Sequence, residues 1–274
     1  MKLIACIVVR LHSKRLPMKA FRELCVGKNR ITTLELLILR AKRADSFDKI
    51  VLCTSENPED QPLKAVAEKH NIEFYAGSER DVSERLAETA RIYGCDAIAR
   101  LTGDNPLVSF ERIKLMLGLL NSGYDYIRYD KVPVGFSPEI FTLAALESVR
   151  KSMNLEESEY MMLYLYNPVE NNCLLMRVNE GDYSRFSVTV DTEEDLNRVQ
   201  SVINDLGDRA MSNSGYEKVL LDVMSTHGQA ESNYINLSSE VKYPENRIIT
   251  FKDYLIDMEN RRGLSDKLIV NAKH

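Results

Sequence analysis

The first half of the chain alternates strand-like and helix-like segments, and this alternation is the strongest constraint on its fold. Four short apolar runs read as strands, at residues 3–9, 49–54, 73–75 and 95–101. Between them apolar residues recur at helical spacing, as in the segment from Thr33 to Arg43. Such alternation is typical of a parallel sheet with right-handed crossovers. We therefore expect an α/β fold, with a mostly parallel sheet and helices on both faces.

The alternation changes twice along the chain. Residues 124–168 are rich in Tyr and contain Pro133, Gly135 and Pro138, and we expect a small subdomain there that covers a pocket. A late strand is predicted over Arg185–Val190, followed by a helix that Thr192 caps and that ends at Leu206. Beyond Gly207 the composition becomes more polar. We therefore predict a main domain over residues 1–206 and a C-terminal appendage over residues 207–274.

A basic loop follows the first predicted strand. Five cationic residues fall within thirteen positions of a chain whose net charge is −5: Arg10, Lys14, Arg15, Lys19 and Arg22. Concentrated positive charge in an acidic protein requires an anionic partner or abundant water. Ligands of α/β proteins bind at the carboxyl ends of parallel strands, so the loop is predicted to hold a polyphosphate. A solvated charged turn is the alternative.

Two aspartates complement this basic loop. Asp104 and Asp191 each follow a predicted strand, so a parallel sheet would bring both to one rim. Mg²⁺ prefers one or two carboxylates together with water and phosphate oxygens, which predicts a magnesium site and attack on a phosphorus atom. Two alternatives remain at this stage: Asp191 as a helix-capping residue and Asp104 as a turn residue.

Motif content disfavours several enzyme classes. The chain has neither a Gly-x-x-x-x-Gly-Lys-Ser/Thr motif nor a Gly-x-Gly-x-x-Gly motif after the first strand, which weakens P-loop and dinucleotide-binding interpretations. Its four histidines offer little basis for a histidine-dependent triad or a zinc site.

Composition restricts the setting in which the protein works. A pI of about 5.6 argues against nucleic-acid binding, and no apolar run approaches the length of about 20 residues that crosses a bilayer. We expect the apolar N-terminal run to be a core strand and not a signal peptide. The five cysteines are widely spaced, which indicates free thiols and a reducing cytoplasm.

Five motifs, taken together and in order, resemble those of cytidylyltransferases. The first is Arg10-x-x-Ser13-x-Arg-Leu-Pro-x-Lys19; the others occupy residues 54–60, 77–79, 100–107 and 190–196. The resemblance spans residues 1–206. It is closest to the group named for spore coat polysaccharide biosynthesis protein F, which is related to CMP-Kdo and CMP-acylneuraminate synthetases.

This resemblance implies a nucleotide-diphospho-sugar transferase-like (Rossmann-like) fold, CTP as donor and Mg²⁺ as cofactor. The implied reaction transfers CMP to an acidic sugar, such as a nonulosonic acid or Kdo-like sugar, or to a related surface-polysaccharide precursor of the cell envelope, and releases pyrophosphate. A homodimer formed through residues 129–178, the acceptor-covering subdomain, is also implied.

Residue roles follow from the motif positions. Catalytic roles fall to Arg15, Lys19 and Asp104. Nucleotide binding falls to Arg10, Ser13, Arg15, Lys19, Ser78, Arg85 and Thr102, with Ser78 and Arg85 near the cytidine. Asp104 and Asp191 would hold the metal, and Glu139 and Tyr160 would contact the acceptor.

The chain departs from the family pattern at three places. Met18 replaces a glycine of the basic loop, the segment Gly135–Glu139 loses an aspartate, and Tyr160 stands where the family has histidine. Two competing functions are therefore kept. One is a glycosyltransferase of related fold, although Gly103-Asp104-Asn105 lacks the Asp-x-Asp pair of that class; the other is a nucleotide-binding relative without catalysis.

Overall fold

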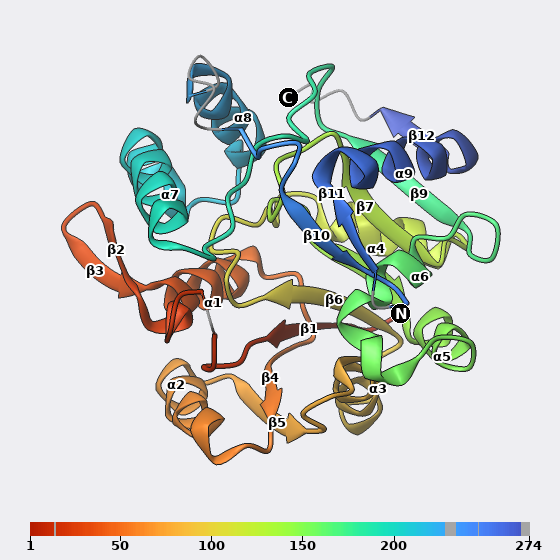
Figure 1. The fold of residues 1–274 in the computed structure, drawn as a ribbon. Coiled ribbons are helices and arrows are strands. Elements are labelled where there is room, and N and C mark those ends of the chain that lie inside the picture. Colours follow the sequence, from red (N-terminus) through yellow and green to blue (C-terminus); the bar gives the residue numbers. More distant parts are fainter. Residues whose placement is uncertain (14, 228–233, 246, 270–274) are drawn as a thin grey trace.

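An eight-stranded sheet forms the centre of the molecule (Figure 1). The computed structural model describes residues 1–13, 15–227, 234–245 and 247–269. Along the sheet the strand order is β12-β9-β7-β8-β6-β1-β4-β5. The strands are β1 (Leu3–Val8), β4 (Lys49–Ser55), β5 (Glu73–Gly77), β6 (Ala97–Thr102), β7 (Tyr126–Asp130), β8 (Glu139–Thr142), β9 (Cys173–Arg177) and β12 (Asp266–Ile269). Only β8 runs antiparallel to its neighbours, so the predicted mostly parallel sheet is confirmed.

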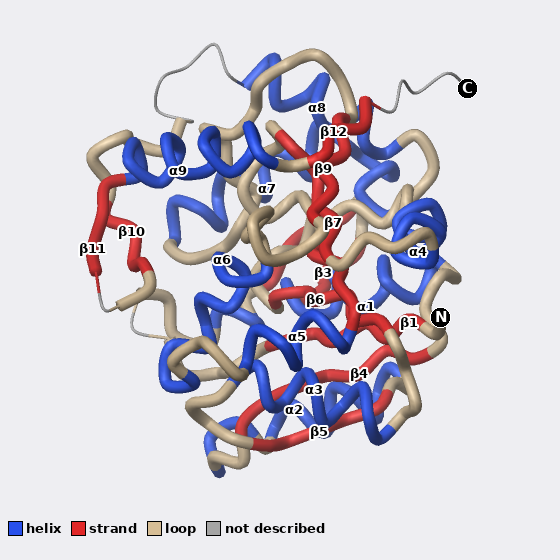
Figure 2. Tube along the Cα trace, turned by 90° about the vertical axis from the view of Figure 1, so that its right-hand side faces the viewer, coloured by secondary structure: helices blue, strands red, loops and turns tan. Residues whose placement is uncertain are grey.

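Helices cover both faces of this sheet, as predicted (Figure 2). The alternation of side chains along β1 shows the division: Leu3 and Ile7 join one core, and Ile4 joins the other. The first core also takes side chains from α1 (Thr33–Ala44), α2 (Pro62–His70), α4 (Ile113–Asn121), α7 (Glu193–Leu206) and α8 (Tyr216–His227). The second takes them from α3 (Val82–Ile92), α5 (Leu143–Arg150), α6 (Met161–Leu165) and α9 (Phe251–Leu264).

Two helices begin where side-chain capping predicts. Thr32 and Glu35 form a capping box at the start of α1, and Thr192 and Asp195 form another at the start of α7. Short 3-10 helices complete the helical elements: η1 (Lys19–Phe21), η2 (Pro58–Asp60), η3 (Leu155–Tyr160) and η4 (Gly207–Met211).

The prediction of a strand over Arg185–Val190 is wrong. Its alternate residues Phe186, Val188 and Val190 are buried, which explains the strand-like pattern. However, the segment pairs with a loop through a single β-bridge between Val134 and Ser187 instead of joining the sheet. Apolar alternation reports burial of one face and does not show whether a hydrogen-bonding partner exists.

Several strands lie where the sequence predicted none. Strands β7 and β8 fall in the tyrosine-rich segment, β9 follows it, and two hairpins lie outside the main sheet. The hairpins are β2 (Glu23–Val26) with β3 (Asn29–Thr32), and β10 (Glu240–Tyr243) with β11 (Arg247–Thr250).

Residues after 206 contribute to the same cores and the same sheet. Tyr216 and Leu220 of α8 are fully buried in the core that also contains Leu3, and β12 extends the sheet by pairing with β9. The domain boundary between residues 206 and 207 stays a prediction. Residues on its two sides contact each other in the core and in the sheet. Among the described residues, none of the helices combines the length and hydrophobicity needed to cross a bilayer.

Candidate active site

The candidate site lies at the carboxyl ends of β1 and β6, two neighbouring parallel strands of the sheet. The turn after β6 is held against β1, because the amide of Gly103 donates to the carbonyl oxygen of Val8 at 2.9 Å. A Cβ on Gly103 would lie 2.8 Å from the Cβ of Val9. Only glycine permits this close approach without displacing Val9, so Gly103 sets the position of Asp104.

Lys19 joins the two aspartates that the sequence analysis selected. Its Nζ lies 2.5 Å from Oδ2 of Asp104 and 2.8 Å from Oδ1 of Asp191. Burial disfavours the charged ammonium, but the carboxylates outweigh this effect and raise the pKa of Lys19 above its usual value. Lys19 therefore stays protonated at neutral pH, and one cation already occupies the point on which the two carboxylates converge.

We call the cluster of Arg15, Lys19, Asp104 and Asp191 the rim. The contacts within it resolve the alternatives left open for the two aspartates. The capping box of α7 is made by Thr192 and Asp195, so the carboxylate of Asp191 is not the cap; it binds Lys19, and also Arg15 at 3.0 Å. Asp104 does sit in a turn, but its carboxylate is directed to Lys19 and does not close that turn. Both side chains are about a quarter exposed, which leaves them accessible to a ligand.

Buried anchors shape the basic loop and leave two of its cations, Arg10 and Arg15, exposed. Leu11 and Leu16 are buried, and the amide of Leu11 donates to the buried carboxylate of Asp60 at 2.7 Å. The side chains of Arg10 and Arg15 are exposed, and that of Ser13, partly exposed, accepts weakly from the amide of Leu16 at 3.4 Å. Lys14 lies outside the described residues.

Arg85 is the most unusual of the predicted nucleotide-binding residues. Its side chain is fully buried, and one terminal nitrogen donates to the carbonyl oxygens of Ser78 and Glu79. Its Nε and second terminal nitrogen have no partner in the protein. Burial, reinforced by nearby Arg10, lowers the pKa of Arg85. Two unsatisfied buried donors are consistent with a group that donates hydrogen bonds to a ligand.

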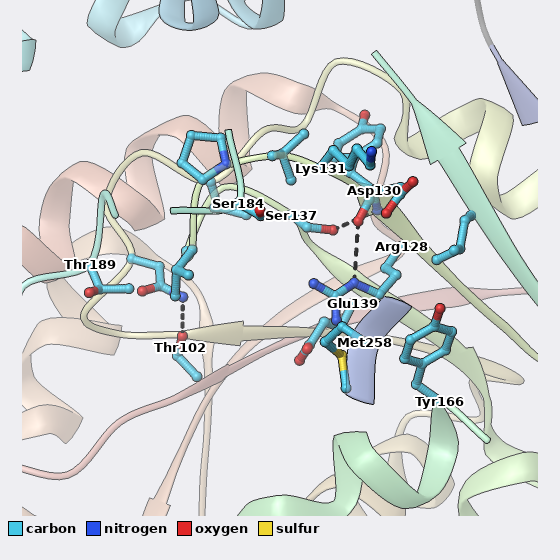
Figure 3. Close-up of a pocket in the computed structure, with 18 of the residues that line it drawn as sticks. Thr102, Arg128, Asp130, Lys131, Ser137, Glu139, Tyr166, Ser184, Thr189 and Met258 are labelled. Carbon is cyan, nitrogen blue, oxygen red and sulfur yellow. Dashed lines mark hydrogen bonds between the residues drawn. The ribbon is translucent and has the colours of Figure 1, made fainter. Parts of the chain in front are cut away.

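A cavity of about 330 Å³ opens beside this rim (Figure 3). Of the predicted site residues, Thr102, Asp104 and Glu139 line it. In the view of Figure 3, Thr102 and Thr189 lie at one end, and Tyr166 and Met258 lie at the other. The cavity therefore extends from the aspartate of the rim to side chains of α9.

The other predicted site residues lie outside the cavity lining. Arg15, Lys19 and Asp191 join Asp104 through ion pairs. Arg85 donates to Ser78 and lies near Arg10, and Tyr160 ends η3. Apart from Asp104, neither these residues nor Ser13 line the cavity. The cavity's tyrosines are Tyr129, Tyr166 and Tyr254. The acceptor role of Tyr160, like the other individual roles, stays a prediction.

Sequence reasoning did not select two groups of lining residues. Arg128 and Asp130 lie on a strand that was not predicted. Tyr254, Met258 and Arg262 lie on α9, in the C-terminal segment to which the sequence analysis assigned no site residue. Their spacing of four residues places them on one helix face, which is the signal that was available in the sequence.

The donor set at the rim suits a magnesium ion. Asp104 and Asp191 converge on one cation, and Mg²⁺ takes one or two carboxylates together with phosphate oxygens. Among the described residues there is no cluster of three or more His, Cys, Asp or Glu side chains that could hold a metal ion.

Comparison with known proteins places the chain in a family. The cytidylyltransferase family model matches residues 4–206, the segment that contains the basic loop and both aspartates. The chain belongs to the cytidylyltransferase family. It is therefore a CTP-dependent nucleotidyltransferase with the nucleotide-diphospho-sugar transferase-like fold that the motifs implied.

Individual cytidylyltransferases and related proteins are similar over most of this length. An uncharacterized protein from Methanocaldococcus jannaschii is 33% identical over 72% of this chain and 81% of its own. Spore coat polysaccharide biosynthesis protein SpsF from Bacillus subtilis is 29% identical over 74% of this chain and 87% of its own. A 3-deoxy-manno-octulosonate cytidylyltransferase from Koribacter versatilis is 28% identical over 49% of each chain.

A solved structure extends the similarity to the fold. The cytidylyltransferase from Leptospira borgpetersenii has a TM-score of 0.71 and 28% identity, with 84% of this chain and 96% of that chain covered.

Proposed function

We propose that this cytidylyltransferase transfers CMP from CTP to a hydroxyl group of an acidic sugar of the nonulosonic or Kdo class, and that the product serves surface-polysaccharide synthesis. The observation that carries the proposal is the convergence of Asp104 and Asp191 on Lys19 beside a sugar-sized cavity. One rim thus combines cations for a triphosphate, carboxylates for a metal and space for a second substrate.

The reaction is an in-line displacement. The acceptor hydroxyl loses its proton to water as its oxygen forms a bond to the α-phosphorus of CTP. The bond from that phosphorus to the bridging oxygen breaks, and pyrophosphate leaves. Arg10, Arg15 and Lys19 bind and orient the triphosphate and offset its charge as pyrophosphate separates. The unsatisfied donors of Arg85 would bind the cytidine portion of the nucleotide, together with Ser78 just after β5 and Thr102 at the end of β6.

Magnesium is the expected cofactor. Asp104 and Asp191 would hold it, and the bound ion supplies electrostatic stabilisation of the phosphoryl oxygens. The charge of Lys19 is then free to move from the carboxylates to a phosphate group.

The acidic character of the acceptor rests on relatives and on the cavity. One similar protein is a 3-deoxy-manno-octulosonate cytidylyltransferase, and another is a polysaccharide biosynthesis protein. The cavity is lined by charged side chains from β6, β7 and the following loop, which favours a polar acceptor over an apolar one.

The inactive-relative alternative rested partly on Met18, which replaces a family glycine. Met18 has φ 55° and ψ 30°, the left-handed conformation that glycine adopts easily, and its side chain is 44% exposed. The loop thus keeps a glycine-like backbone, and the methionine side chain points away from the buried core. This geometry supports an active enzyme.

Two expectations accompany the proposal. Cys6, Cys25, Cys53, Cys95 and Cys173 are free thiols, in agreement with a cytoplasmic location. A homodimer through residues 129–178 remains the proposed assembly. Size-exclusion chromatography with light scattering measures the molar mass and so tests whether the protein is a dimer.

A thermal-shift screen of the four ribonucleoside triphosphates with Mg²⁺ tests the donor. CTP is expected to raise the melting temperature most, because a ligand that binds only the folded state stabilises it according to its affinity. Pyrophosphate release is then measured with Kdo and N-acetylneuraminate as acceptors. Equal shifts for all four triphosphates, or CTP binding without pyrophosphate release in the presence of either acid, would contradict the proposal.

A further inference from the structure

Among the residues that the structure describes, one arginine of the cavity forms no ion pair with a carboxylate. Within the described part of the chain, Arg128 has no carboxylate at ion-pair distance; its Nε donates to the carbonyl oxygen of Tyr129 at 3.2 Å. Its guanidinium carbon lies 5.8 Å from the centre of the Tyr166 ring. An aromatic face attracts the cation but does not neutralise it.

The other charged groups beyond the rim are already paired. Glu139 binds Arg100 at 2.6 Å, and Lys131 lies 3.4 Å from Asp182. Asp130 is shared by Arg177 at 3.2 Å and Arg262 at 2.7 Å. Arg128 is therefore the cation left over in this part of the cavity, and its two terminal nitrogens remain available to an anionic ligand.

The wall opposite the rim is provided by α9, which lies outside the segment that the family model matches. Tyr254, Leu255, Met258 and Arg262 line the cavity from this helix. In Figure 3 the labelled Met258 and Tyr166 lie at the same end of the cavity as Arg128 and Glu139.

Hydrogen bonds hold this wall in place. Arg262 on α9 binds Asp130 at the end of β7, and Arg261 donates to the carbonyl oxygens of Leu163 and Tyr166, each at 2.5 Å. Met258 is buried against the second core. The helix is thus attached to the strand that carries Arg128, so the shape of the cavity end is preorganised.

We infer that Arg128 and the α9 face formed by Tyr254 and Met258 make an acceptor subsite, in which Arg128 binds the acceptor's carboxylate and α9 limits the acceptor's size. This inference rests on the proposed function, because it assigns the second substrate of that reaction. A guanidinium binds a carboxylate through two parallel hydrogen bonds. Asp104 lies at the other end of the cavity, so an acceptor bound to Arg128 would extend its reacting hydroxyl toward Asp104 and the nucleotide. The C-terminal segment thereby determines acceptor specificity.

The test compares each sugar acid with its uncharged C1 amide. Kdo, N-acetylneuraminate and their amides are assayed as acceptors for pyrophosphate release from CTP, and their binding is measured by calorimetry with a non-reactive CTP analogue present. The wild-type enzyme is expected to prefer an acid to its amide. Arg128→Gln should weaken acid binding and raise its KM on the order of 10- to 100-fold, to the level of the amide, without changing the KM for CTP.

Arg247→Gln provides a matched control. Arg247 also lies over a tyrosine ring, 4.8 Å from the centre of Tyr243, but it is exposed and does not line the cavity. This variant should keep the preference for acids. Met258→Trp tests the wall independently of charge: it should weaken binding of both acid and amide and leave CTP binding unchanged.

The outcomes separate this inference from the proposed function. If CTP binds but Arg128→Gln retains the acid preference, or the wild type shows no such preference, the carboxylate subsite is wrong. If Met258→Trp leaves acceptor binding unchanged, the wall is wrong. If CTP itself fails to shift the melting temperature, the proposed function fails instead.

Discussion

The backbone amide of Val190 donates a hydrogen bond to the carbonyl oxygen of Asp104 at 2.9 Å. This bond ties the segment that precedes α7 to the turn that follows β6. It places Asp191 beside Asp104, where both carboxylates contact Lys19. The rim is therefore assembled by the backbone before any ligand is present.

Replacement of Asp104 tests the rim. Asp104→Asn keeps the shape of the side chain but removes its charge, so the fold should persist while turnover falls about a hundredfold, as for loss of one well-placed charged contact. Pyrophosphate release at saturating Mg²⁺ measures the effect. Glu193→Gln is the control, since it removes an exposed carboxylate two residues beyond Asp191 that pairs with Arg22. Unchanged turnover in Asp104→Asn would count against the metal assignment.

Gly103→Ala tests the contact between the residues that follow β1 and β6. The added Cβ would lie 2.8 Å from Cβ and Cγ2 of Val9, so the turn should shift and carry Asp104 with it. We expect a loss of about 1–3 kcal/mol in the free energy of unfolding, measured by urea denaturation, together with reduced turnover. In Val9→Ala/Gly103→Ala, removal of the obstructing methyls should recover part of both losses. Strictly additive effects would show that the contact does not position Asp104.

Met18 offers a test of backbone strain in the basic loop. With φ at 55°, a residue with a Cβ is held in a conformation that disfavours it by about 1–2 kcal/mol. Glycine relieves this cost but loses more conformational entropy on folding. Met18→Gly should therefore be more stable than Met18→Ala by about 1 kcal/mol in urea denaturation, with the KM for CTP retained. A less stable glycine variant would indicate that the loop is not held in this conformation.

Glu35 predicts part of the acid dependence of stability. Burial alone would raise the pKa of this capping-box carboxyl, but hydrogen bonds from Lys69, Thr32 and His70 lower it to about 2. Because the folded-state pKa is lower than the usual value of 4.5, Glu35 contributes stability above pH 4.5, and this contribution is lost as the pH falls toward 2.

The measurement is the free energy of unfolding at several pH values. With a discount for partial exposure, Glu35→Gln should cost roughly 1–2 kcal/mol near pH 6 and much less near pH 2.5. Glu23→Gln removes an exposed carboxylate paired with Arg30 and should change little at either pH. Parallel curves for the wild type and Glu35→Gln would contradict the assignment.

Local sequence determined the first half of the fold and the chemistry of the rim. Strand and helix periods are properties of neighbouring residues, and strand ends in a parallel sheet share one edge, so the meeting of Lys19 with Asp104 was predictable from order along the chain. The family motifs pointed to the same residues.

Only the tertiary structure decided the cavity beside the rim. The position of Arg128 in that cavity becomes significant only when its possible partners are seen to be paired with other residues: Glu139 with Arg100, and Asp130 with Arg177 and Arg262. Likewise, α9 lines the cavity because Arg261 and Arg262 bind groups distant in sequence. Pairing between distant side chains depends on where the folded chain brings them, and no local pattern encodes that choice.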